Sequence, residues 1–573
     1  MLDVIIRDGS VVDGTGAPAR RADVGIRDGR VVAIGDVDEQ ARRTIDADGK
    51  IVAPGFVDIH THYDAQVFFD TTLSPSPLHG VTTVIGGNCG FTIAPLAPEH
   101  GDYIRRMLAR VEGMPLAALE AGVPWDWRSF GDYLDRIEGT LAPNAGFLVG
   151  HSTLRRVVMG ERATKGAATT DDLEAMSRLL AESLRAGGLG FSSSWARTHN
   201  DGEGDMVPSR HATEEELVAL CRVVRDHPGT TLEFIPGVGQ FEDFAPDLMT
   251  RMSVAADRPL NWNVLFVTSA AEAMVDHNLA ASDYAAERGG RVLALTLPDA
   301  PSPRICFDNG FLLDTIPGWQ KPMALPHDEK KAMLASREGR AALLEAAGGG
   351  KHLVGVANWH TYVINETFAE ENKRFEGRSV GDVARELGKE PFDALLDIVV
   401  ADDLMTGLGF PPSGERVEDW EARVKVWRDP RTIVGASDAG AHLDFLATFN
   451  YSTAMLGKAV RQHGLLPMEE AIRMLTEVPA RVYGLTERGR LQEGWHADVV
   501  VLDPDTIGSQ KVRMRFDLPT GAPRLYCGAD GIDHVLVNGT EIVDHGELTD
   551  ARPGTLLRSG RDTETVTATA GTS

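Results

Sequence analysis

Two histidines separated by one residue, His60 and His62, follow a short apolar run near the start of the chain. The run Phe56-Val57-Asp58-Ile59 begins after Pro54-Gly55 and is typical of a short buried strand. Because side chains alternate along a strand, His60 and His62 leave it on the same face. Two imidazoles held in this way can bind one metal ion in a fixed geometry. The sequence therefore predicts one half of a metal site here.

Three further side chains suited to metal or proton chemistry stand just past apolar runs. Cys89, in Asn88-Cys89-Gly90, would be a strong zinc ligand as a thiolate, although a buried inert cysteine is the commoner outcome. His151 could bind a metal, but we favour a role in orienting a neighbouring group. Asp438 could simply form an Asx turn before a glycine. Because the chain also carries His60 and His62, we prefer to interpret Asp438 as a base that takes a proton from water and passes it to a leaving amine.

The elements that must position these side chains alternate between apolar strands and helical patterns over residues 53–484. Helices are expected over 170–186 and 213–226, each opened by a threonine followed by acidic residues. Roughly eight strand–helix units favour an α/β fold, a (β/α)8 TIM-like barrel, in which the carboxyl ends of the strands meet at one face. A doubly wound sheet is the alternative, but no Gly-x-Gly-x-x-Gly follows a strand.

The two ends of the chain have a different texture, with short alternating strands and Asp-Gly turns. Residues 1–52 and 485–557 are each too small to bury a core alone, so we expect one discontinuous β-sandwich domain built from both termini. Residues 298–350 break the barrel rhythm and are expected to form an insertion, either a lid or a pocket wall. Residues 558–573 are rich in Thr, Gly, Ala and Ser and are expected to be a flexible tail.

The composition limits the classes of partner. A formal net charge of -27 argues against nucleic acid and anionic membrane surfaces, so an anionic substrate would need local cationic groups. Four scattered cysteines imply no disulfide framework, and no apolar run approaches membrane-spanning length. We expect a cytoplasmic protein that acts on a small molecule; the oligomeric state, including a homo-oligomer, is left open.

Several motifs together resemble the amidohydrolase superfamily, and within it the N-acyl-D-amino-acid deacylase (D-aminoacylase) branch. The resemblance covers nearly the whole chain, and Asn-Cys-Gly is more specific to the branch than His-x-His. It implies a metal-dependent barrel beside a small β-sandwich, zinc held by His60, His62 and Cys89, and Asp438 as a general base linked to the metal. The matching segments are 54–66, 74–76, 79–84, 87–95, 149–155, Ser437-Asp438 and Ala497-Asp498-Val499-Val500.

The chain departs from this branch at the fifth and sixth strands, where the branch carries histidine ligands. The corresponding strands read Leu232-Glu233-Phe234-Ile235 and Leu260-Asn261-Trp262-Asn263, without histidine. Glu233 could replace one ligand with an oxygen, and His360 or His442 could complete a four-coordinate shell or line the pocket instead. We therefore expect one or two zinc ions, with another divalent metal as an alternative.

The substrate-binding residues are expected near the same strand ends. Asn261 and Asn263 suggest a pocket that reads amides and apolar surface. Arg155 and Arg197 are candidates for clamping a carboxylate, as bidentate guanidinium groups do. His151, His360 and His442 complete the expected lining.

The function that we predict is hydrolysis of a C–N amide bond in a small N-acyl amino acid or related amide by a zinc-dependent amidohydrolase. A mononuclear deaminase or a cyclic amide or imide hydrolase of the same superfamily is the alternative. The missing histidines also leave open a barrel that binds a ligand without catalysis.

Overall fold

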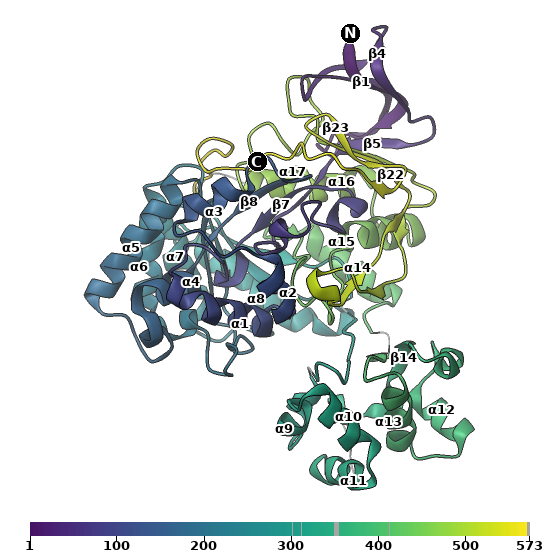
Figure 1. Cartoon of the computed structure of the whole chain (residues 1–573). Coiled ribbons are helices and arrows are strands. Elements are labelled where there is room, and N and C mark those ends of the chain that lie inside the picture. The colour runs from purple at the N-terminus through teal and green to yellow at the C-terminus, as the bar shows by residue number, and fades with distance from the viewer. Residues whose placement is uncertain (301, 311, 349–354, 412, 570–573) are drawn as a thin grey trace. The chain divides into compact units, whose positions relative to one another are not determined.

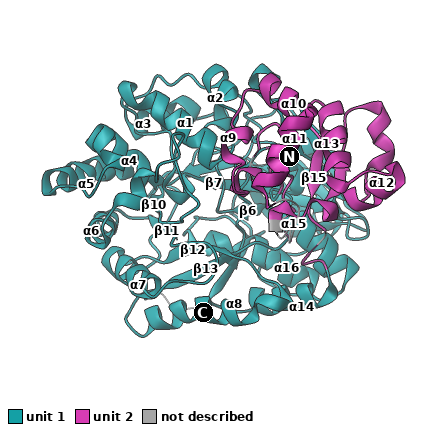
Figure 2. Cartoon of the chain, turned by 90° about the horizontal axis from the view of Figure 1, so that it is seen from below, with its two compact units in different colours: residues 1–299, 416–443, 448–573 teal, residues 300–415, 444–447 magenta. Residues whose placement is uncertain are grey.

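The computed structural model describes residues 1–300, 302–310, 312–348, 355–411 and 413–569. These residues divide into two units (Figure 2). Unit 1 comprises 1–299, 416–443 and 448–573, and unit 2 comprises 300–415 and 444–447. Among the described residues, no helix is both long and apolar enough to cross a lipid bilayer.

Unit 1 contains a ring of parallel strands built from two hydrogen-bonded sheets, β6-β7-β8 and β9-β10-β11-β12-β13-β16. Since β8 and β9 are consecutive halves of one strand, the described residues provide eight strand positions. A parallel bridge between Thr61 and Ala439 joins the last strand to the first. The predicted (β/α)8 barrel is therefore confirmed. The strands are β6 (Phe56–Asp58), β7 (Val81–Gly86), β8 (Asn144–Phe147), β9 (Val149–Gly150), β10 (Gly190–Ser194), β11 (Thr231–Ile235), β12 (Leu260–Leu265), β13 (Val292–Thr296) and β16 (Thr432–Val434).

Helices of unit 1 connect these strands, and two of them begin where the sequence predicts. The hydroxyls of Thr169 and Thr213 accept hydrogen bonds from the backbone N–H groups of Asp172 and Glu216, which caps α5 and α6. The helices are α1 (Gly101–Val111), α2 (Leu116–Gly122), α3 (Phe130–Ile137), α4 (His151–Met159), α5 (Thr170–Arg185), α6 (Glu214–Arg225), α7 (Ala245–Ala256), α8 (Glu272–Ala286), α14 (Val417–Trp427), α15 (Tyr451–Ala454), α16 (Met468–Leu475) and α17 (Glu477–Val482).

The two ends of the chain share one sheet with the order β24-β23-β22-β17-β5-β1-β2-β3, and β4 pairs with β1. Figure 1 shows the purple N-terminal strands beside the yellow C-terminal strands. Val52 lies opposite Val501, and both are fully buried in a core with Val24, Ile26 and Leu536. The predicted discontinuous β domain is confirmed. Its strands are β1 (Leu2–Val11), β2 (Arg20–Arg27), β3 (Arg30–Gly35), β4 (Ala41–Asp46), β5 (Ile51–Pro54), β17 (Val499–Leu502), β22 (Ile532–Val537), β23 (Thr540–Asp544) and β24 (Glu547–Leu548).

Two further strand pairs lie within the C-terminal segment. They are β18 (Gly508–Ser509) with β21 (Ala529–Asp530), and β19 (Arg513–Arg515) with β20 (Arg524–Tyr526).

Unit 2 has a hydrophobic core of its own, in which Trp319 stacks on Trp359 with ring centroids 5.8 Å apart. The insertion expected over 298–350 forms only its first part, because apolar residues of 359–408 pack into the same core. Residues 301, 311, 349 and 350 of that insertion lie outside the described residues. Its elements are α9 (Gln320–Met323), α10 (His327–Ala335), α11 (Arg337–Ala346), β14 (Val363–Glu366), α12 (Val380–Leu387), α13 (Pro391–Ala401) and β15 (Gly407–Gly409).

The segment 558–569 differs from the flexible tail that the sequence suggests. The backbone N–H of Glu564 donates to the carbonyl of Gly484 at 2.7 Å, and that of Gly229 donates to the Thr565 hydroxyl at 2.9 Å. Thr563 is only 4% exposed. The threonines that indicated disorder instead supply hydroxyls for backbone groups of unit 1. Residues 570–573 of the expected tail lie outside the described residues.

Candidate active site

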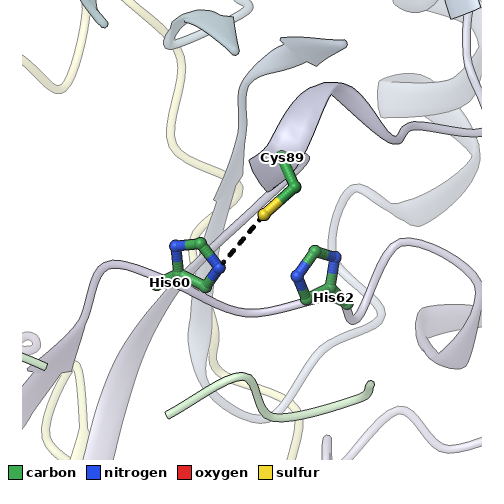
Figure 3. Close-up of side chains that lie close together, drawn as sticks. All are labelled: His60, His62 and Cys89. Atoms are coloured by element: carbon green, nitrogen blue, oxygen red, sulfur yellow. Dashed lines mark hydrogen bonds between the residues drawn. The ribbon is translucent and has the colours of Figure 1, made fainter. Parts of the chain in front are cut away.

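The residues just past β6 and β7 bring two imidazoles and a thiol together. Figure 3 shows His60 and His62 on one strand end and the Cys89 sulfur pointing toward them. The Cys89 Sγ lies 3.6 Å from His60 Nε2, and the three side chains have ligand atoms within 4.8 Å of one another. Each residue is at most 5% exposed. The positive φ of Cys89, 54°, places its side chain in a turn between Gly87 and Gly90.

Asp438 reaches the same group from the loop after β16. Its Oδ1 lies 3.0 Å from His62 Nε2 and 3.5 Å from His60 Nε2. Its side chain is 31% exposed, compared with 3% for each histidine, so the carboxylate stands on the open side of the group. Burial opposes its ionisation, but hydrogen bonds from His60 and His62 outweigh burial and hold the pKa of Asp438 well below its usual value. The side chain is therefore ionised at neutral pH.

Glu112, which the sequence reasoning missed, lies on the other side of His62. It follows α1, is 2% exposed, and places Oε1 3.5 Å from His62 Nδ1. Burial disfavours a charged His62, but the carboxylates of Glu112 and Asp438 outweigh it and raise the pKa of His62 to about 10. The carbonyl of Glu112 also accepts a hydrogen bond from the backbone N–H of His442. No motif marks a glutamate at a helix end, so no sequence signal pointed to it.

His442, predicted as a ligand or lining residue, lies next to Asp438. Its Nε2 is 3.6 Å from Asp438 Oδ2, and its side chain is 24% exposed. It therefore stands at the open edge of the group.

Glu233 and Asn263 hold Cys89 from β11 and β12. The Cys89 backbone N–H donates to Glu233 Oε2 at 2.8 Å, and Asn263 Nδ2 donates to the Cys89 sulfur at 3.3 Å. Burial raises the pKa of Glu233 to about 8. Its Oε1 is buried and has no hydrogen-bond partner. The two imidazoles and the thiol form a donor set that fits Zn²⁺.

Arg155 and His151, both expected to bind substrate, are engaged by an internal carboxylate, and for His151 this agrees with the favoured role of orienting a neighbouring group. Both side chains are fully buried and meet Glu216 on α6. Arg155 Nη1 donates to both carboxylate oxygens at 2.5 and 2.6 Å, and His151 Nε2 lies 2.8 Å from one of them. The Ser193 hydroxyl lies 2.8 Å from His151 Nδ1. The network satisfies the Arg155 charge, so this guanidinium is not available to clamp a carboxylate.

Asn261 and His360 were both expected to line the substrate pocket. Asn261 Nδ2 donates to the carbonyl of Leu232 at 3.0 Å and to the Tyr483 hydroxyl at 3.1 Å, so it braces neighbouring strands. His360 lies in unit 2, in the turn Trp359–Thr361, and is exposed.

His199, in the loop after β10, is a second residue that the sequence reasoning missed. Its ring packs against Phe91 with centroids 5.2 Å apart, and its Nδ1 lies 2.7 Å from the Ser194 hydroxyl. Burial, followed by the charge of His442, lowers the pKa of His199 to about 3. The charges of His62 and Asp438 also affect the pKa of His199. His199 therefore lies within electrostatic reach of His60, His62, Cys89 and Asp438, which we call the metal-binding group.

The sequence matches the amidohydrolase family over residues 43–543. It is 29% identical to the D-aminoacylase of Alcaligenes xylosoxydans xylosoxydans over 561 residues, covering 97% of both chains. It is 30% identical to the N-acyl-D-glutamate deacylase of the same organism over 562 residues, covering 97% of this chain and 96% of that protein.

A solved structure is also similar to this chain over nearly its whole length. The N-acyl-D-glutamate deacylase of Bordetella bronchiseptica, crystallised with zinc and a phosphonate inhibitor, superposes with a TM-score of 0.63. The two chains are 27% identical, and the match covers 97% of this chain and all of the other. The predicted resemblance is confirmed.

Proposed function

The chain belongs to the amidohydrolase family, and we propose that it removes the acyl group from N-acyl-D-amino acids. It is a zinc-dependent hydrolase of carbon–nitrogen bonds other than peptide bonds. The observation that carries the finer proposal is the convergence of His60, His62, Cys89 and Asp438 at the carboxyl end of the barrel.

In this proposal His60, His62 and Cys89 would hold the zinc ion, and Asp438, which lies beside the two histidines, would act as the base. When bound there, zinc polarises a carbonyl and lowers the pKa of a water molecule toward ~7. Asp438 takes a proton from the water that attacks the acyl carbon. It then passes this proton to the nitrogen, so that the C–N bond breaks to give a carboxylate and a free amine.

We further propose a single zinc ion. Glu233 and Asn263 stand at the strand ends where the resemblance leads one to expect histidines. Both are engaged with Cys89, one through its backbone N–H and the other through its sulfur. Their contacts support a role in fixing the thiol rather than in building a second site of histidines.

We also propose that the protein is cytoplasmic and acts on a small molecule. The charge of -27 supports a partner other than nucleic acid or an anionic membrane. A homo-oligomer stays a prediction.

The test combines metal analysis with product identification. The purified full chain is expected to hold one zinc per chain and to release acetate and a free amine from N-acetyl-D-amino acids, with the L enantiomers slower. His60→Ala and Cys89→Ala should lose zinc and activity together. Release of ammonia, or opening of a cyclic amide without acetate, would favour the deaminase or cyclic amide alternatives. Absence of stoichiometric zinc and of turnover would favour a binding barrel.

A further inference from the structure

A small pocket opens beyond the carboxyl ends of β10 and β11, the strands on the Cys89 side of the metal-binding group. Its volume is about 280 Å³, and its walls include Trp195, Phe241 and Phe244 together with Arg197 and Arg210. This volume lies near the lower end of the range for small-molecule pockets. It suits the side chain and carboxylate of one amino acid.

The backbone ties this pocket to the metal-binding group. Trp195 directly follows β10, and its N–H donates to the carbonyl of Ile235 at 2.8 Å. Ile235 ends β11, the strand on which Glu233 accepts the hydrogen bond from Cys89. Arg210, in the pocket wall, also donates to the backbone carbonyl of His199, whose ring is influenced by the charges of His62 and Asp438, so the pocket lies near the metal-binding group.

Arg210 is the unusual residue of this pocket. Its Nη1 donates to the carbonyls of Arg197 and His199 at 3.3 and 3.1 Å and to Asn200 Oδ1 at 3.0 Å. These three acceptors are neutral. Over the part of the chain that the structure describes, no carboxylate lies within ion-pair distance of Arg210. Its guanidinium is thus oriented by neutral oxygens, and its positive charge can still pair with an anion.

Arg197 provides the contrast within the same pocket. Its Nη2 donates to Glu242 Oε1 at 2.7 Å, and both side chains are well exposed, at 80% and 57%. A guanidinium already matched by a carboxylate has less to gain from a second anion.

The negative charge of the protein makes Arg210 important for binding an anion. With a net charge of -27, the protein repels an anionic substrate except where a local positive group attracts it. Around Arg210 the walls are aromatic, with Trp195 and Phe244 ring centroids 5.4 Å apart. The pocket therefore offers one cation and an apolar surface side by side.

We propose that Arg210 binds the carboxylate of the substrate's amino-acid half, and that the aromatic wall accepts an apolar side chain. This inference rests on the proposed function and adds the residue that selects an acylated amino acid over an uncharged amide. Arg155, which the sequence favoured for this task, is occupied by Glu216.

The experiment compares N-acetyl-D-leucine with its carboxamide, N-acetyl-D-leucinamide, as substrates of the zinc-loaded full chain. Arg210→Gln is expected to raise KM for the carboxylate about tenfold to a hundredfold, with kcat little changed. KM for the carboxamide should change less than about twofold. Arg210→Lys should restore part of the loss, and the matched variant Arg197→Gln should raise KM less than about threefold.

Binding measured without turnover separates this inference from the proposed function. In an Asp438→Asn background, calorimetry should show N-acetyl-D-leucine binding at least about tenfold more weakly when Arg210 is also replaced by Gln. If no acetate is released by the parent chain but this binding difference is found, the hydrolase proposal fails and the Arg210 inference stands. Equal effects on the carboxylate and the carboxamide, or no effect on either, would overturn the inference. Should Arg210→Gln not fold, the parent chain must still prefer the carboxylate at least about tenfold in KM; lack of preference overturns it.

Discussion

The imidazole of His62 stands between two carboxylates, with Nδ1 3.5 Å from Glu112 and Nε2 3.0 Å from Asp438. A buried carboxylate beside one ring nitrogen of a metal-binding histidine orients the ring. Glu112 therefore holds the His62 ring with Nε2 facing Asp438.

Replacing Glu112 by Gln is expected to lower zinc affinity about tenfold to a hundredfold, because His62 loses its orienting anion. The measurement is a competition titration with a chromophoric chelator. Glu112→Asp should recover part of the affinity, and the exposed Glu182→Gln serves as a control. Unchanged affinity in Glu112→Gln would show that Glu112 does not position the ligand.

Asp438→Asn is expected to lower kcat by about 10²–10⁴, since an amide cannot carry the proton from water to the leaving nitrogen. The three ligands His60, His62 and Cys89 remain, so zinc content should stay near one per chain. Steady-state kinetics and metal analysis on the same preparation check both statements. Near-normal turnover in a zinc-loaded variant would refute the base role.

Zinc affinity is expected to rise with pH. Burial, followed by the charge of Glu233, raises the pKa of the Cys89 thiol well above its usual value, and the pKa of His62 is raised to about 10. Both groups are protonated in the metal-free protein at neutral pH, so binding must release their protons. The slope of log affinity against pH, measured by competition with a chelator, should be about two between pH 6 and 8. A flat profile would contradict this assignment.

Glu216→Gln is expected to destabilise the protein by about 3–5 kcal/mol, because Arg155 is left buried without its anion. Urea unfolding measures the loss, and the exposed pair Arg178–Glu174 gives a control in Glu174→Gln, for which about 0–1 kcal/mol is expected. KM of the folded fraction should be close to that of the parent. A large rise in KM with little loss of stability would instead indicate that Arg155 takes part in substrate binding.

The sequence was sufficient to predict residues that follow strands. His60, His62, Cys89 and Asp438 each come just after an apolar run, and the barrel fold gathers such positions at one face. Glu112 and His199 belong to a helix end and an irregular loop, where no period links sequence spacing to position in space. Arg155 was misjudged for a related reason. It lies on α4 and meets Glu216 on α6, a partnership set by helix packing that the local sequence does not reveal.

The boundary of unit 2 was harder to predict than the barrel. Proline and glycine marked its first part, but the apolar residues from Trp359 onward resemble ordinary barrel helices. Only the shared core shows that 359–408 packs with 305–343.

The sheet shared by the two chain ends also sets an order of events during synthesis. β5 ends at Pro54, the Gly55 N–H donates to the carbonyl of Asp498, and β6, which leads to His60 and His62, begins at the next residue. β5 therefore leaves the ribosome early, whereas its partner β17 is translated near the end of the chain. Pairings of such long sequence separation form slowly and leave an unpaired strand edge in the nascent chain. Because β5 runs directly into β6, we expect the start of the barrel to be anchored to the β domain only after translation has passed β17.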